Sequence, residues 1–395
     1  MKVAWRSQRD GGERSKRTFG GVSPVVAVSV GFLLAANIAM SLWLLVRKVA
    51  EFPLVSGQPG PINDFIVRYA AGWMARHGQA AATYDELAYH AAQVQILPGL
   101  QGRMLWMHPP PALLAWAPIS ALPYASAAAA WLVLSAAIYI VMARKVVGRR
   151  WAAAAAFVFA GLTLDLLYTQ NGAVLTGLLA AGLVLMRDRP ALAGIPLGYI
   201  LVKPHWAPVV LIALVAGRRW RAFASTVAVA GALYLTSVLV FGIDTWMAWF
   251  GQLDAGFKLI PELSINELVS PYSALQPTDP VLATVVQTVC TLGAFGAVAW
   301  VWHRERSEST RAAVLALALS VASPYLHFYD LAVLGIAVAW LARDSLDDGD
   351  PAAAVILFTL ASSAVWFGRV ASILFGVQVT PLLLVVALLA LLRRP

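Results

Sequence analysis

Charged residues and cysteine are both scarce in this sequence. Only 12% of its 395 residues are charged, against 60% that are apolar, and the mean hydropathy is +0.73. A soluble protein cannot bury that much apolar surface, so the composition excludes a soluble globular domain and indicates an all-α polytopic membrane protein. The single cysteine, Cys290, lies inside an apolar run, which excludes a disulfide framework within the chain.

Several motifs of soluble enzymes are also absent. The sequence has no nucleotide-binding loop, no soluble domain and no repeat with a period of about 20–50 residues. His327 and Asp330 are one helical turn apart, but they do not form an H-E-x-x-H motif and no cysteine accompanies them. The sequence therefore predicts no required cofactor and no specific metal site, and it leaves dependence on a divalent metal open.

The basic residues indicate a membrane and not a nucleic-acid partner. The formal net charge is +9, but Lys and Arg occur in short clusters between apolar runs, as they do in the cytoplasmic loops of membrane proteins. Residues 1–23 are polar and basic, and we expect them to form a disordered cytoplasmic tail. Residues 24–395 are then a single transmembrane domain.

Hydropathy predicts about twelve transmembrane helices, judged against the ~20 residues that cross the hydrocarbon core. The candidate runs are 24–46, 124–143, 151–168, 172–187, 190–203, 204–217, 222–242, 281–302, 311–324, 328–342, 351–367 and 376–392. Basic clusters lie at every second junction, so we expect both termini on the cytoplasmic side of the cytoplasmic membrane. The segments 51–108 and 243–280 are then the two large extracytoplasmic loops.

Residues 108–123 interrupt this alternation. The segment is apolar but short, and prolines break it repeatedly. A full crossing would move Arg149 and Arg150 to the outer face, so a short re-entrant or half-depth element is the preferred interpretation.

The first loop contains the carboxylate of greatest interest. Asn63 can cap a helix that carries Asp64 in its first turn. Spacing alone favours a structural role, in which Asp64 interacts with the helix dipole and pairs with Arg68. A functional carboxylate just beyond a membrane exit is the alternative. Such a helix would lie in the membrane interface with one apolar face, made of Ile62, Phe65, Ile66, Tyr69 and Trp73.

Other polar residues fall on the same predicted face of the membrane. A second short helix is predicted near 84–97, with Asp85 and Glu86 as helix-start acids. His108 precedes a proline-fixed turn and is either a solvated interfacial residue or a ligand for phosphate or sugar. The segment Lys203-Pro204-His205 breaks a long apolar stretch. Its cations either extend to the headgroups or hold a lipid phosphate.

The stretch from Ser323 to Asp330 has two interpretations as well. His327 and Asp330 are either a structural pair at the start of a span, or a site that orients the imidazole and binds phosphate or hydroxyl. Ionisable residues at membrane depth are costly, so each of them raises a functional hypothesis.

Taken together and in order, these residues resemble glycosyltransferase family 87 of the polyprenyl-phosphate-sugar-dependent C-type superfamily. One departure is His108, where many relatives have an aromatic residue before the proline pair. The resemblance extends over about residues 30–390, and its features are Asn63-Asp64-Phe65, Tyr69-Ala-Ala, Gly78, Tyr84-Asp85, His108-Pro-Pro, Gln170-Asn171-Gly172, Lys203-Pro204, Arg218-Arg-Trp-Arg221 and Ser323-Pro-Tyr325 with His327 and Asp330.

The resemblance implies a C-type glycosyltransferase that moves a hexose, typically mannose, from a polyprenyl-phosphate donor to a lipid-linked or glycan acceptor outside the cytoplasm, with inversion. It implies Asp64 as the catalytic base. An inverting transfer needs one such base, while the phosphate leaving group needs positive charge and no acid partner. The residues expected to bind donor phosphate or substrate are Lys203, His205, His327, Asp330, His108, Asn171 and Tyr325.

A multi-pass transporter or flippase of lipid-linked sugars is the main alternative, because it also needs buried charges and broken helices. We would expect it to have two halves with matching interrupted helices, and the sequence shows no such symmetry. A ligase or polymerase of lipid-linked glycans and a non-catalytic assembly factor are further alternatives. In each case the partners include membrane lipids, and a monomer or small homo-oligomer is expected.

Overall fold

The computed structural model describes residues 23–50, 63–100, 104–264, 267–304 and 306–393, with the backbone alone given for residues 63 and 254–264. Within these ranges the chain is helical and contains no β-strand. The prediction of an all-α protein is therefore confirmed. The predicted basic tail falls almost entirely outside the described residues, as does Ile62.

The described elements follow one another in a simple order. They are α1 (Pro24–Ala50), α3 (Asn63–Arg76), η2 (Ala81–Tyr84), α4 (Glu86–Ile96), η3 (Pro110–Ala112), α5 (Leu113–Ile119), α6 (Tyr124–Val147), α7 (Ala152–Phe157), α8 (Ala160–Leu167), α9 (Gly172–Asp188), α10 (Pro190–Ile200), α11 (Ala207–Ala216), α12 (Trp220–Phe241), α13 (Ile243–Ser264), α14 (Pro271–Leu275), α15 (Pro280–His303), α16 (Glu308–Val321), η4 (Phe328–Val333), α17 (Leu334–Asp347), α18 (Pro351–Phe375) and α19 (Thr380–Leu392).

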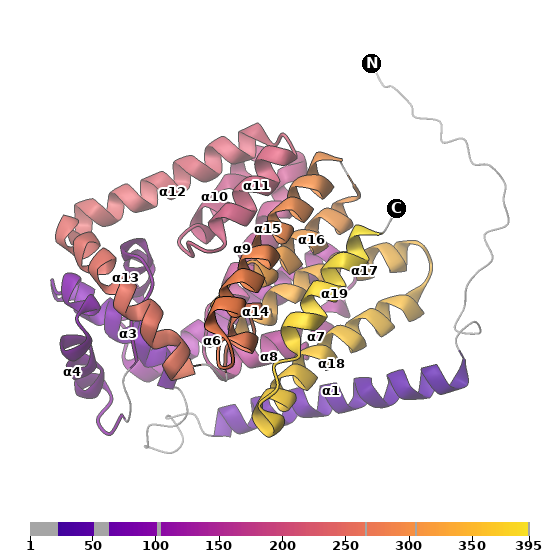
Figure 1. The fold of residues 1–395 in the computed structure, drawn as a ribbon, viewed down its shortest axis with the longest axis horizontal. Coiled ribbons are helices and arrows are strands. Elements are labelled where there is room, and N and C mark those ends of the chain that lie inside the picture. Colours follow the sequence, from indigo (N-terminus) through magenta and orange to yellow (C-terminus); the bar gives the residue numbers. More distant parts are fainter. Residues whose placement is uncertain (1–22, 51–62, 101–103, 265–266, 305, 394–395) are drawn as a thin grey trace.

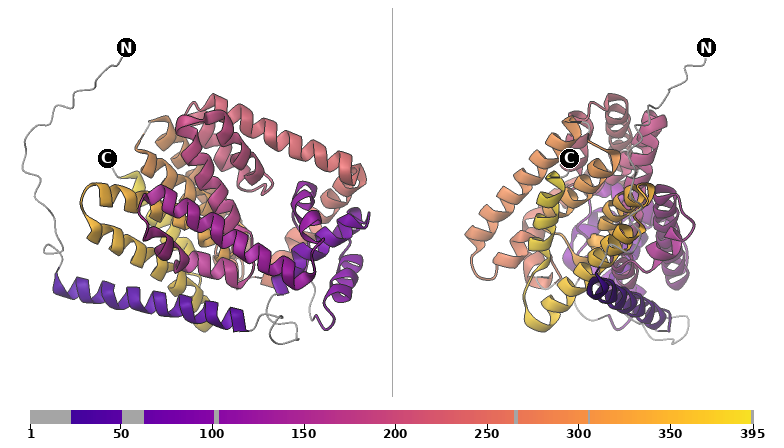
Figure 2. Two further views of the ribbon diagram at one scale, coloured as in Figure 1. Left: turned by 180° about the vertical axis from the view of Figure 1, so that it is seen from behind. Right: turned by 90° about the vertical axis from the view of Figure 1, so that its right-hand side faces the viewer.

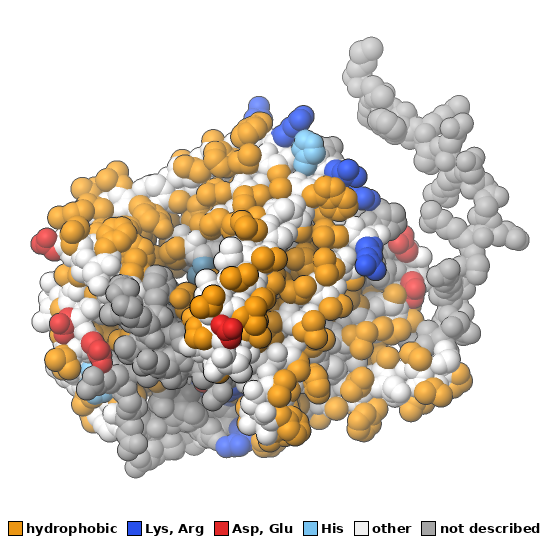
Figure 3. Space-filling model, viewed as in Figure 1, with side chains coloured by type: hydrophobic (Ala, Val, Ile, Leu, Met, Phe, Trp, Pro, Cys, Tyr) orange, Lys and Arg blue, Asp and Glu red, His pale blue; other side chains and the backbone are white. Residues whose placement is uncertain are grey.

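The long helices form a bundle with two distinct ends. Helices α3, α4 and α13 gather at one end, on the left in Figure 1, where α12 runs along the upper edge and α1 lies along the lower edge toward the right. Two further views show the same bundle with α1 on its outside (Figure 2). Several Lys and Arg side chains lie toward the right of the same view in Figure 3, on a surface that is otherwise largely hydrophobic. We call the two ends the α3 end and the basic end.

Five described helices are long and apolar enough to cross a membrane, namely α1, α6, α12, α15 and α18. They confirm the prediction of a membrane protein. Twelve full crossings are not confirmed, because several predicted spans form shorter helices. Helix α10 has 11 residues, which at 1.5 Å per residue extends about 16 Å, roughly half of the ~30 Å hydrocarbon core.

Three predicted spans are divided or shortened, namely 151–168, 190–203 and 204–217. The run 151–168 contains α7 and α8, which are separated at Val158 and Phe159. Helices α10 and α11 meet at a turn over residues 201–206 that contains Pro204. Proline has no N–H to donate and disfavours a helical conformation in Lys203 before it, so the turn falls there.

Residues 108–123 form η3 and the seven-residue helix α5. A helix of that length extends about 10 Å and cannot cross a bilayer, in agreement with the predicted short element. It packs closely on α3, since a Cβ on Gly72 would lie 2.2 Å from the carbonyl oxygen of Trp116.

Both predicted helices of the first loop are present. Asp85 caps α4, because its Oδ1 accepts a hydrogen bond from the Ala88 N–H at 2.8 Å, which confirms its role as a helix-start acid. The expectation for the apolar face of α3 was wrong. Phe65 is fully buried against Trp116 and Tyr124, with ring centroids 6.2 and 5.4 Å away. Protein therefore covers the face that was expected to lie in lipid.

The second large loop is also mostly helical, comprising α13 and α14. After α13 the chain lies antiparallel to residues 326–328, with the Val269 N–H donating to Leu326 O at 2.7 Å and the Phe328 N–H donating to Glu267 O at 3.1 Å. This pairing holds the segment before η4 in place, and η4 carries Asp330.

Candidate active site

Asp64 lies in the first turn of α3 and contacts Arg68 through an intervening side chain. Gln170 Nε2 donates to Asp64 Oδ2 at 2.7 Å, and Gln170 Oε1 accepts from Arg68 Nη2. Arg68 Nη1 reaches the backbone oxygen of Asp64 at 3.3 Å. The structural interpretation from spacing, a direct pair between the two side chains, is therefore wrong: Gln170 bridges them.

The surroundings of Asp64 suit a carboxylate that accepts a proton. Burial raises the pKa of Asp64 above its usual value, while the nearby charges of Arg68 and Lys48 and the hydrogen bond from Gln170 oppose that rise. Asp64 itself keeps part of its surface accessible. Lys48, at the end of α1, donates to Leu167 O at 2.6 Å, next to the turn that carries Gln170.

That turn, residues 165–172, is fixed by groups that sequence reasoning missed. Asp165 is fully buried, and its carboxylate faces the backbone N–H groups of Gly172 and Ala173 at the start of α9. A Cβ on Gly172 would come within 2.7 Å of Asp165 Oδ1, so only glycine fits there. An available signal was the position of Asp165 itself, an ionisable residue inside a predicted span.

Lys203 and Asp330 form a buried ion pair. Lys203 Nζ lies 2.5 Å from Asp330 Oδ1, with only 8% and 2% of the two residues exposed. Asp330 also accepts from the His327 N–H at 3.3 Å, and Lys203 Nζ lies 4.8 Å from the centre of the Trp206 ring. The predicted contact between His327 and Asp330 is present, but it uses the backbone of His327, and Lys203 is the ionic partner.

The predicted site histidines lie in one electrostatic environment. Burial lowers the pKa of His108 to about 3, with further lowering from Arg68, Lys203 and His205. Burial likewise lowers the pKa of His327 to about 4, against the raising effect of Asp330. The lowered pKa values favour neutral imidazoles near pH 7, which can donate and accept hydrogen bonds.

His205 and His327 each keep part of their surface accessible. His205 Nε2 is buried and has no hydrogen-bond partner in the described part of the chain. His327 stacks on Tyr329 with ring centroids 4.8 Å apart, and its Nδ1 lies 3.2 Å from Tyr325 O. Both histidines are half-buried, as are the flanking predicted residues Asn171 and Tyr325.

Two further charged residues lie beside this cluster and were not predicted. The charge of Asp64 contributes to a raised pKa at Glu267, for which burial is the main cause, and Arg369 opposes the rise. Arg369 lies over the Phe328 ring at 3.9 Å and donates to the Tyr168 hydroxyl at 3.2 Å. The structure thus brings Asp64, from the first loop, close to groups from α18 and from the segment before α14.

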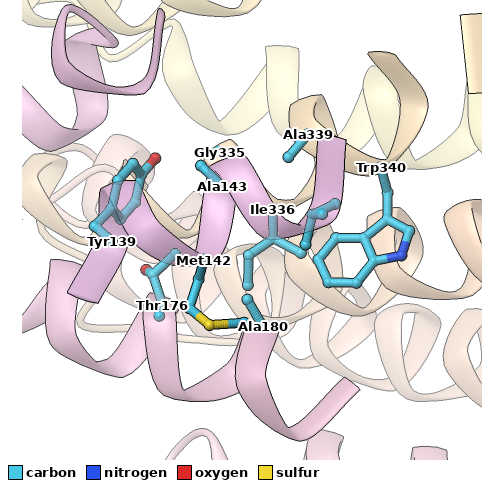
Figure 4. A pocket seen from close by; sticks show the side chains of 11 residues that line it. Tyr139, Met142, Ala143, Thr176, Ala180, Gly335, Ile336, Ala339 and Trp340 are labelled. Carbon is cyan, nitrogen blue, oxygen red and sulfur yellow. The ribbon is translucent and has the colours of Figure 1, made fainter. Parts of the chain in front are cut away.

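Figure 3 shows a small hollow on the face toward the viewer, with a histidine side chain at its floor. Two other cavities are apolar and lie elsewhere. One of about 10 Å³ lies among Tyr139, Thr176 and Trp340 (Figure 4), and one of about 430 Å³ lies among α1, α6, α7, α17 and α18. Neither is lined by Asp64 or by Lys203.

No group of three or more His, Cys, Asp or Glu side chains is arranged as metal ligands within the described ranges. The chemistry that the site offers is that of a half-buried carboxylate surrounded by guanidinium and ammonium groups, neutral imidazoles and a bridging amide. Groups of these kinds can accept a proton and can bind an anionic group.

Comparison with known proteins identifies the family. Residues 106–324 match the sequence profile of glycosyltransferase family 87, which covers more than half of the chain, and the protein belongs to that family. It is therefore a glycosyltransferase. The match includes Gln170, Lys203 and His205, while Asp64, His327 and Asp330 lie outside it. Searches among curated proteins and among solved structures gave no match.

Proposed function

We propose that the protein transfers a hexose, with mannose as the first candidate, from a polyprenyl-phosphate donor to a lipid-linked or glycan acceptor. The acceptor hydroxyl attacks the anomeric carbon, the bond from that carbon to the phosphate oxygen breaks, and the configuration inverts. The proton of the hydroxyl passes to Asp64. The phosphate leaves with the bonding electron pair, so no general acid is needed.

The observation that carries the proposal is the environment of Asp64. Gln170 engages its Oδ2 at 2.7 Å, and Oδ1 has no hydrogen-bond partner among the described residues, so it is available to an acceptor hydroxyl. Its raised pKa makes it a better proton acceptor than a solvated aspartate.

The leaving phosphate requires positive charge, and the cations near Asp64 supply it. Arg68 and Lys48 act on Asp64 directly, and Arg369 acts on the neighbouring Glu267. Guanidinium groups suit phosphate because they donate two parallel hydrogen bonds. The neutral imidazoles of His108 and His327 then bind sugar or phosphate oxygens by hydrogen bonds.

The test is transfer from a radiolabelled polyprenyl-phosphate hexose by protein purified in lipid nanodiscs. Asp64→Asn keeps the shape of the side chain and removes the base, so we expect transfer to fall by about 10²–10⁴-fold, the usual contribution of a general base. Asp85→Asn is the matched control. Asp85 is an exposed helix cap, and Asn also caps helices well, so its transfer rate should equal that of the wild type.

Retention of transfer by folded Asp64→Asn protein would exclude Asp64 as the base. Movement of the lipid-linked sugar across a proteoliposome membrane without transfer would exclude this enzymatic function and support a flippase.

A further inference from the structure

We propose that Gln170 is a positioning residue that keeps Asp64 available as a base by holding the Arg68 guanidinium away from it. This inference rests on the proposed role of Asp64. It concerns a residue that does not react, and it makes its own predictions.

The geometry uses both ends of one amide. Gln170 Oε1 accepts from Arg68 Nη2, while Gln170 Nε2 donates to Asp64 Oδ2 at 2.7 Å. An amide can accept from a cation through its oxygen and donate to a carboxylate through its nitrogen at the same time. Glutamate would accept but not donate, and methionine would do neither.

Without the amide, a direct pair is the expected arrangement. Asp64 and Arg68 are four residues apart on α3, the spacing at which oppositely charged side chains on a helix meet. Arg68 is only 4% exposed, so its guanidinium cannot turn to solvent. A direct pair would use the carboxylate oxygens that the acceptor hydroxyl needs, and it would weaken Asp64 as a base.

The backbone around Gln170 is built to hold the amide in place. Trp131 Nε1 donates to Gln170 O at 2.9 Å, and the Gln170 N–H donates to Asp165 O at 2.9 Å. The preceding residue, Thr169, is buried with φ of 51°, a conformation that residues other than glycine rarely adopt. Such a conformation persists when the surroundings fix it, and it is enriched at functional sites.

Other groups also face Asp64, and they are common to every variant below. These are Lys48 from α1, Glu267 from the segment before α14, Tyr124 from α6 and Tyr329 from η4. These groups are the same in every variant. If the acid limb moves in opposite directions in two variants of Gln170, the cause is therefore the contact of Gln170 with Arg68 and Asp64.

The experiment compares pH profiles of kcat/KM for the wild type, Gln170→Met and Gln170→Glu. In Gln170→Met, Arg68 is released to pair with Asp64, so the acid limb should move to lower pH by about 1–3 units and the plateau rate should fall. In Gln170→Glu a second carboxylate lies beside Asp64, so the acid limb should move to higher pH. A role in folding alone would lower the rate in both variants without moving the limbs in opposite directions.

Arg68→Met tests whether the downward shift of the acid limb in Gln170→Met requires the Arg68 guanidinium. With the guanidinium absent, adding Gln170→Met should cause no downward shift. Infrared titration of the Asp64 carboxyl measures its pKa without turnover, as the difference between each protein and its Asp64→Asn counterpart. The pKa should be lowest in Gln170→Met and highest in Gln170→Glu. Loss of transfer in Asp64→Asn together with coincident limbs in the Gln170 variants would overturn this inference alone. Absence of transfer in the wild type would overturn the proposed function, and the infrared titration would still decide the role of Gln170.

Discussion

The Lys203–Asp330 pair shows how a single contact changes the role that is inferred for a residue. Lys203 was expected to hold a lipid phosphate, because it lies beside a helix break. In the structure Asp330 already neutralises it at 2.5 Å, and both side chains are buried. Breaking such a pair is costly, because it leaves one charge buried without compensation.

Lys203→Met should therefore destabilise the protein by about 3–5 kcal/mol, seen as a lower thermal midpoint in detergent. The double variant Lys203→Met with Asp330→Asn removes both charges and should recover most of that loss. Transfer activity in the double variant then separates the two roles. Near-normal activity indicates a structural pair, and a stable but inactive double variant indicates that Lys203 or Asp330 binds substrate.

At the scale of elements, the position of Asp64 depends on how α3 packs. Phe65 is buried among Trp116 and Tyr124, and Gly72 lies against the backbone of α5. Because α5 cannot shift without moving η3 and His108 before it, α3 and α5 act as one unit that fixes both Asp64 and His108.

Gly72→Ala tests this packing. The added Cβ would lie 2.2 Å from Trp116 O, so α3 must move away from α5. We expect a loss of about 1–3 kcal/mol in stability, as for other overpacked sites, and reduced transfer.

Gly231→Ala in α12 is the control for that experiment, since nothing lies within 4 Å of its added Cβ. Replacing a helical glycine in open space by alanine should raise the free energy of unfolding by about 0.5–1 kcal/mol. Equal thermal midpoints for the two variants would contradict the close approach of α3 and α5.

For the molecule as a whole, the two ends of the bundle differ in character. The α3 end holds Asp64, and basic residues such as Arg144 and Lys145 lie in the last turn of α6. Under the positive-inside rule we expect the basic end to face the cytoplasm and the site around Asp64 to face the opposite side.

Cysteine labelling measures this orientation. Replacing the single cysteine by Cys290→Ser gives a background without thiols. Gln79→Cys near the α3 end and Asp348→Cys in the turn after α17 each place one thiol at an exposed position. A membrane-impermeant maleimide applied to intact cells should label only Gln79→Cys, and both should react after lysis. Labelling of both in intact cells would contradict an arrangement with the two ends on opposite sides.

Much of the candidate site could be predicted from the sequence because ionisable residues are costly in a membrane and therefore few. Asp64, His108, Lys203, His205 and His327 were singled out on that ground, and the charge of Arg68 acts on Asp64, on His108 and on His327. Gln170 was noted within a motif but was given no role, because an uncharged amide is not rare enough to attract attention. The role proposed for Gln170 depends on its contacts with Asp64 and Arg68, which are more than one hundred positions away in the sequence.

The composition and hydropathy of the sequence by themselves determined an all-helical membrane protein, since so many apolar residues can be buried only in lipid or against other helices. Local caps and periodicity also predicted a helix that begins at Asn63 and a second near 84–97, and the structure has them at Asn63–Arg76 and Glu86–Ile96. Only the tertiary structure decided which helices are too short to cross. It also decided that protein covers the aromatic face of α3, and that Gln170 separates Asp64 from Arg68. Those outcomes depend on long-range packing, which local spacing does not specify.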